Sequence, residues 1–130
     1  MLDVREQTNP QLLPKVRSDL IMASAAGQHC ALRVSSLYPG HKCAGRDTTV
    51  ACHLPTIGKG TGTKVTDLAV AFGCAHCHAI VDGPDKKRRD FIETNYPAAY
   101  AGRLLDALVE TQARLVGEAI IFVRDGEILL

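Results

Sequence analysis

The stretch Cys74-Ala75-His76-Cys77-His78 decides the fold of this chain, because it joins a metal-binding pattern to the start of a helix. Two cysteines separated by two residues can present both thiolates to one tetrahedral zinc ion from a single tight turn. The helix is predicted to begin within this stretch and to run to Asp82, where Gly83-Pro84 stops it. We therefore expect a zinc-bound turn that leads directly into a short helix.

A structural zinc site needs two further ligands, and Cys30 and Cys43 are the candidates for this second pair. Their separation is wider than that in a compact zinc finger. In a chain of 130 residues, such a site would contribute folding free energy directly. For the other cysteine and histidine residues, the sequence makes less specific predictions. Cys52 is expected to be a buried strand residue, and His29 and His41 exposed loop residues.

A second set of side chains favours catalysis. His78 and Asp82 are four residues apart, so they share one face of the predicted helix. Together they could bind one divalent ion (Mg²⁺, Mn²⁺ or Zn²⁺) and leave positions open for water and phosphate. His53 ends a predicted strand and could act as a general base. The alternative is a surface ion pair between His78 and Asp82, with His53 as a structural histidine.

The composition suits one globular domain over residues 1–130. Hydrophobic residues make up 46% of the chain and charged residues 22%. The N-terminus lacks the apolar segment of a signal peptide, and no apolar run has the length of a transmembrane helix, so we expect a cytoplasmic protein. Cytosolic thiols stay reduced. The clustered cysteines therefore predict a metal site rather than disulfides.

The chain is predicted to be an α+β protein in three parts. These are an extended arm (1–14), a metal core (15–83), and a helical extension that ends in a hairpin (84–130). The core is predicted to hold helices over 18–26 and 66–72 and strands over 30–34 and 48–54. The extension is predicted to hold a charged helix over 85–95, a long helix over 98–116, and strands over 119–123 and 128–130 around an Asp-Gly turn.

Four short motifs in combination resemble the HNH, or ββα-metal, nucleases, and over about residues 15–83 the chain looks most like the YbcO-type prophage nucleases. The motifs are Ala51-Cys52-His53, Gly58-Lys59-Gly60, Asp67-Leu68 and Cys74-Ala75-His76-Cys77-His78. The resemblance implies a small zinc-stabilised ββα-metal (HNH, treble-clef-like) core with an added C-terminal helix and hairpin. It implies that His53 is a general base and that His78 and Asp82 bind a catalytic divalent metal. It also implies four ligands of a structural zinc ion: Cys30, Cys43, Cys74 and Cys77.

Two positions depart from the HNH pattern. These nucleases usually carry Asp or His as a metal ligand directly before the general base, where this chain has Cys52. Their middle Asn is replaced here by Asp67, at a different offset from the second cysteine pair. The departures leave open which metal is bound and whether Asp67 joins the metal site.

Basic residues flank the expected site in the sequence, although the formal net charge is only +1. Such cations could neutralise phosphates, whereas the aromatic content of 5% disfavours binding by base stacking. The alternative is an ordinary solvated helix face. The nucleic-acid-binding candidates are Lys59, Lys64, Lys86, Lys87, Arg88 and Arg89.

Two functions from different classes fit these features. The first is a metal-dependent HNH-like endonuclease that hydrolyses DNA, branched or single-stranded forms included, encoded by a phage or prophage and acting in recombination or repair in a bacterial host. The second is a non-catalytic zinc-binding DNA module, which would need none of the predicted catalytic residues. A thiol redox protein is disfavoured, because its C-x2-C would follow a strand in a βαβ unit. The apolar C-terminus could complete the core or form a homodimer contact.

Overall fold

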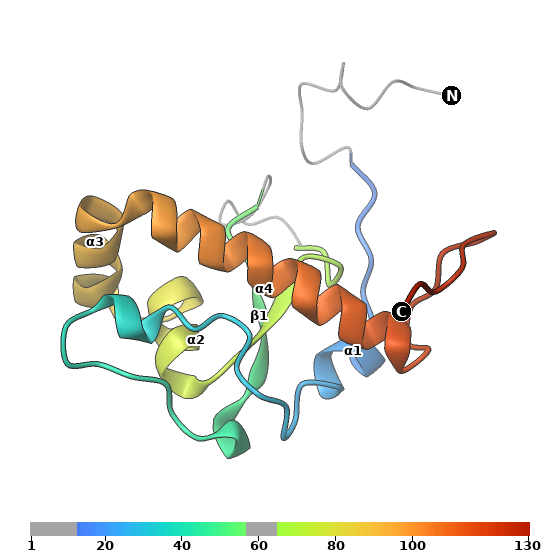
Figure 1. Ribbon diagram of the computed structural model, residues 1–130, viewed down its shortest axis with the longest axis horizontal. Helices are drawn as coiled ribbons and strands as arrows, with labels where there is room; N and C mark the ends of the chain where they lie inside the picture. Colours follow the sequence, from blue (N-terminus) through green and yellow to red (C-terminus); the bar gives the residue numbers. More distant parts are fainter. Residues whose placement is uncertain (1–12, 57–64) are drawn as a thin grey trace.

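The computed structural model describes residues 13–56 and 65–130. Most of the predicted N-terminal arm, and the glycine-rich loop with Lys59 and Lys64, lie outside these ranges. The described residues form a small α+β fold (Figure 1). Its elements are α1 (Asp19–Ala23), η3 (Ser35–Leu37), η4 (Arg46–Thr48), β1 (Val50–His53), β2 (Val70–Gly73), α2 (Ala75–Asp82), α3 (Lys86–Asn95) and α4 (Pro97–Gly117).

The two strands form an antiparallel sheet at the centre of the fold, with Cys52 opposite Ala71 and His53 opposite Val70. Helices α1 and α2 both contact β1, and the long helix α4 packs against β2 (Figure 1). A buried hydrogen bond joins α4 to the sheet, since the backbone N–H of Phe72 donates to Thr111 Oγ1 at 3.1 Å. The sheet is therefore covered by helices, and functional side chains can project from the ends of its strands.

Helix α2 begins and ends where the sequence predicts. Cys74 is its N-cap, and the Cys74 thiol accepts a hydrogen bond from the backbone N–H of Cys77. Gly83 ends the helix, and an added Cβ at this position would lie only 2.7 Å from the backbone of Ala79. The N-cap cysteine and the terminal glycine thus fix the bounds of the helix that carries the metal-binding pattern.

Two predictions for the core are wrong. Residues 30–34 form no strand, because Arg33 has a φ of 50°, and the N–H groups of Ala31 and Leu32 both donate to the carbonyl of Phe72. Residues 66–72 form no helix, since 70–73 are strand β2. The side chains of this strand are buried on both faces, and that tertiary packing outweighs the local helical pattern. The strand predicted over 48–54 is present, but shorter, as β1.

The predicted terminal hairpin is also wrong, because residues 119–130 contain no strand in the part of the chain described. The turn itself exists, with the N–H of Gly126 donating to the carbonyl of Val123 and a φ of 63° at Asp125. Ile120 and Ile121 pack against the core, whereas Phe122 is 85% exposed. Among the described helices, none is both long enough and apolar enough to cross a membrane.

Candidate metal centres and their surroundings

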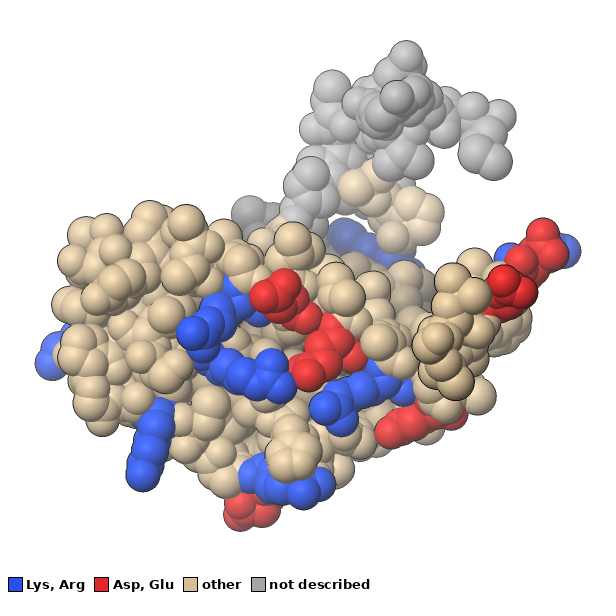
Figure 2. Space-filling view, viewed as in Figure 1, with Lys and Arg blue, Asp and Glu red and all other residues tan. Residues whose placement is uncertain are grey.

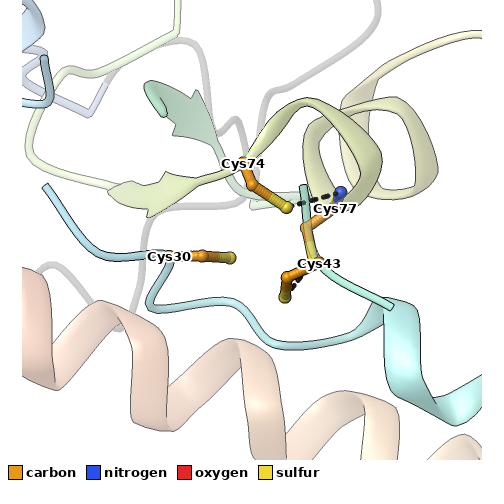
Figure 3. Close-up of side chains that lie close together, drawn as sticks. All are labelled: Cys30, Cys43, Cys74 and Cys77. Carbon is orange, nitrogen blue, oxygen red and sulfur yellow. Dashed lines mark hydrogen bonds between the residues drawn. The ribbon is translucent and has the colours of Figure 1, made fainter. Parts of the chain in front are cut away.

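Four cysteine thiols from three parts of the chain converge beside the start of α2. Cys30 follows α1, Cys43 precedes η4, and Cys74 and Cys77 lie at the N-terminus of α2 (Figure 3). The four Sγ atoms all lie within 4.8 Å of one another. Tetrahedral zinc takes four cysteine thiolates in sites of this kind, so this cluster could hold a metal such as zinc.

Backbone packing brings the two cysteine pairs together. Gly73 ends β2 directly before Cys74, and an added Cβ there would lie 2.5 Å from Leu32 Cδ1. Leu32 is fully buried and lies two residues after Cys30. The absence of a side chain at Gly73 thus allows the segment that carries Cys30 to approach the N-terminus of α2.

Hydrogen bonds to the sulfur atoms suit thiolates. The N–H groups of Ala44 and Arg33 lie 3.3 Å from Cys74 Sγ and 3.5 Å from Cys30 Sγ. The Ser35 hydroxyl lies 3.1 Å from Cys77 Sγ. Donors that point at sulfur stabilise its negative charge, as the surroundings of a zinc-bound cysteine do.

The four thiols cannot all ionise together without a cation. A hydrogen bond with Cys77 lowers the pKa of Cys30 to about 4, and the same bond, with burial, raises the pKa of Cys77. Burial and the nearby Cys30 charge raise the pKa of Cys43 to about 12. One thiolate therefore suppresses ionisation of its neighbours. A bound zinc ion would reverse this and release their protons.

A second cluster lies between β1 and α2. Ligand atoms of Cys52, His78 and Asp82 all lie within 4.8 Å of one another. The sequence paired His78 with Asp82 from their spacing, and the structure brings these two together. Cys52 was predicted only as a buried strand residue. It is buried, but it also completes a group of three possible metal ligands, a role signalled by its place directly before His53.

His53 is paired with Asp67. The ring Nε2 lies 2.9 Å from Asp67 Oδ1, while Asp67 Oδ2 accepts a hydrogen bond from the N–H of Ser18 at 2.7 Å. Burial raises the pKa of the Asp67 carboxyl, but the hydrogen bonds from Ser18 and His53 outweigh burial and hold that pKa below its usual value. The ionised carboxylate fixes the ring, so Nε2 carries the shared proton. Asp67, whose role the sequence left open, thus orients His53.

His53 and Asp82 open into two different hollows at the end of β1. The His53 hollow, about 610 Å³, is lined by Lys15, Val16, Arg17, Asp19, Met22, His53, Val65 and Asp67. The Asp82 hollow, about 500 Å³, is lined by Pro55, Thr56, Val81, Asp82, Gly83, Arg89, Glu93 and Tyr100. Lys15 and Arg17, which sequence reasoning missed, place two cations beside His53.

The basic run of α3 is partly engaged in internal contacts. Arg88 forms an ion pair with Asp85 at 2.8 Å, and Lys86 pairs with Asp90 at 2.6 Å. Arg89 donates hydrogen bonds to the carbonyls of Ile80 and Gly83, and thereby holds α3 against the end of α2. Among the described members of this run, Arg89 therefore has a structural role even though it lines the Asp82 hollow.

Acidic and basic side chains interleave on the face that carries α4 (Figure 2). Glu110 there forms an ion pair with Arg33 at 3.1 Å and lies 3.8 Å from Arg114. Charges that neutralise one another make a weak phosphate-binding surface.

The other histidines lie outside both clusters. His29 is exposed, as predicted, but His41 is only partly exposed, because its ring stacks on His76 with centroids 4.6 Å apart. His76 Nδ1 lies 2.7 Å from the carbonyl oxygen of Lys42. His76 thus braces the loop that carries Cys43.

Known proteins resemble this chain over most of its length. A family model described as "Putative nuclease YbcO" matches residues 19–113. "Putative nuclease YbcO" of Escherichia coli K12 is 29% identical over 99 residues, which cover 75% of this chain and 92% of that protein, and a protein of the same name from Enterobacteria phage 82 matches equally. A solved structure titled as "a putative bacteriophage protein" from Escherichia coli K-12 aligns with a TM-score of 0.49 and 23% identity, over 75% of this chain and 98% of that one.

Proposed function

The chain belongs to the YbcO family, and we propose that it is a metal-dependent endonuclease of the HNH type that hydrolyses phosphodiester bonds in DNA. The observation that carries this proposal is the order β1, β2, α2, with His53 ending the first strand and His78 and Asp82 together on the helix. This is the order of elements that gives the ββα-metal fold its name. The relative from phage 82 supports a phage or prophage origin. A role in recombination or repair is part of the proposal.

His53 is proposed to be the general base. As the water oxygen bonds to phosphorus and the bond to the 3′ oxygen breaks, His53 takes up the proton of the water. Asp67, already hydrogen-bonded to the ring, stabilises the imidazolium that results. This division of roles explains why Asp67 is buried and oriented by a second hydrogen bond from Ser18.

His78 and Asp82 are proposed to hold the catalytic metal. Their nitrogen and oxygen donors suit a divalent ion such as Mg²⁺, Mn²⁺ or Zn²⁺. A bound divalent ion supplies Lewis-acid stabilisation for the charge that develops on the phosphate oxygens. Asp82 is exposed at the edge of its hollow, so one side of the cluster is accessible to a phosphate.

The DNA backbone is proposed to cross the end of β1, with the scissile phosphate between His53 and Asp82. Lys15 and Arg17 line the hollow on one side of this path, and Arg89 lines the hollow on the other. Such contacts neutralise phosphates without reading bases, so binding should weaken steeply as salt rises. The four-cysteine zinc would keep α2, and with it His78 and Asp82, in position.

Nicking of a supercoiled plasmid tests the proposed function. We expect no nicking after a brief EDTA treatment, and nicking after addition of at least one of Mg²⁺, Mn²⁺ and Zn²⁺, because the His78–Asp82 pair is an incomplete site without its ion. Circular dichroism of the same samples shows whether the four-cysteine site and the fold survive the chelator. Nicking by folded protein in EDTA would contradict the proposal. Folded protein that binds DNA but does not cut it with any of the three ions would also contradict the proposal, and would indicate a non-catalytic zinc module.

A further inference from the structure

Cys52 points toward α2 rather than toward His53's hollow. Successive residues of a strand face opposite sides, so Cys52 and His53 project to opposite faces of β1. The hollow beside His53 is lined by Asp19 and Met22 of α1. The Cys52 thiol instead lies within 4.8 Å of the donors of His78 and Asp82 on α2. The Cys52 sulfur thus joins the nitrogen of His78 and the oxygen of Asp82 as a possible metal ligand.

The three residues that supply the donor atoms differ in their exposure to solvent. Cys52 is fully buried, His78 is partly buried, and Asp82 is exposed. Asp82 lies at the edge of the hollow formed with Arg89 and Tyr100. Three protein ligands with one accessible side are typical of zinc sites in which the fourth position takes water or substrate.

The cluster is separate from the four-cysteine site. Cys77 and His78 are neighbours on α2, yet Cys77 belongs to the four-cysteine cluster and His78 to the other, and the two clusters share no ligand. Consecutive residues of a helix point about 100° apart, so one helix can serve both clusters. The chain can therefore hold one ion in each.

We propose that Cys52, His78 and Asp82 form a three-ligand site that selects a thiophilic divalent ion, zinc or cobalt, over magnesium. Magnesium prefers oxygen ligands in octahedral geometry, whereas thiolate and imidazole together favour zinc and cobalt. If the buried Cys52 thiol only filled space in the core, nothing would require the donor atoms of His78 and Asp82 to lie next to it. That this site is the catalytic one rests on the proposed function; the choice of ion does not.

Metal stoichiometry and cobalt spectroscopy test this site. Native mass spectrometry should find two zinc ions on the wild-type chain, and one on the Cys52→Ser and His78→Ala variants. Cobalt added to one-zinc protein should enter the second site, because cobalt displaces zinc from thiolates poorly. The wild type should then show a thiolate-to-cobalt charge-transfer band in the near ultraviolet. Cys52→Ser should lose this band and bind cobalt about 100-fold more weakly, with magnesium binding unchanged.

The controls separate the metal site from folding and from catalysis. Cys52→Ser is close in size to the wild type, and retention of the remaining zinc with an unchanged circular dichroism spectrum shows that the fold is intact. One zinc on the wild type, or a cobalt band that survives Cys52→Ser, would overturn the inference even if the plasmid is nicked. Two zinc ions that depend on Cys52, with no nicking in any metal, would confirm the site while contradicting the nuclease.

Discussion

Replacing Cys77 with alanine is expected to leave the chain without a cooperatively folded state. Cys77 is fully buried and belongs to the four-cysteine cluster, two of whose members, Cys30 and Cys43, lie in segments outside the helices and strands. Structural zinc contributes about 10–16 kcal/mol of apparent binding free energy, whereas whole domains are stable by only about 5–15 kcal/mol. Loss of one thiolate therefore weakens an interaction whose free energy is as large as the entire stability.

Thermal unfolding followed by circular dichroism measures this effect, with zinc content determined on the same samples. Val34→Ala is a matched control, because Val34 is also fully buried but lies outside the cluster. It should cost about 2 kcal/mol and keep the zinc. A Cys77→Ala variant that unfolds cooperatively within a few degrees of the wild type would show that the cluster is not a structural metal site.

Replacing His78 with alanine is expected to lower the nicking rate by about a thousandfold while the fold is retained. His78 is partly exposed and its donor lies in the Cys52–His78–Asp82 cluster, so the change removes a metal ligand but little core packing. The four-cysteine cluster is left complete. Single-turnover nicking at a fixed metal concentration measures the effect.

His76→Ala is the matched control for His78→Ala. Both histidines lie on α2, but His76 is exposed, and its ring contacts the Lys42 carbonyl and the His41 ring rather than the second cluster. Its replacement should change the nicking rate by less than about threefold, since an exposed contact contributes little. Equal losses in the two variants would indicate damage to α2 as a whole and would contradict a specific role for His78.

Sequence spacing predicted the helical parts of the metal centres well. The start of α2 within residues 74–77, the helix end at Gly83 and the pairing of His78 with Asp82 all follow from local rules of helix geometry. The convergence of Cys30 and Cys43 with the second pair was predicted from ligand number and from the family resemblance, and the structure places the four thiols together.

Features that depend on tertiary contacts were not predictable. The sequence predicts a helix where strand β2 begins, because a short apolar run does not reveal its pairing with β1 or its contact with α4. Asp67 could be recognised as the partner of His53 only after the strands were paired, since fourteen positions separate them in the chain. In the sequence, Cys52 looks like any buried strand cysteine. Only the packing of α2 against β1 shows that His78 and Asp82 lie next to it.

The nicking rate of His53→Ala, compared with that of the wild type, tests the central claim most directly. The claim is that a histidine oriented by a buried carboxylate at the end of β1 activates water for attack on DNA. His29→Ala, at an exposed loop position, serves as the control. Loss of a general base should slow single-turnover nicking by about 10²–10⁴-fold, with zinc content and fold unchanged. A His53→Ala variant that nicks the plasmid at the wild-type rate would contradict the claim.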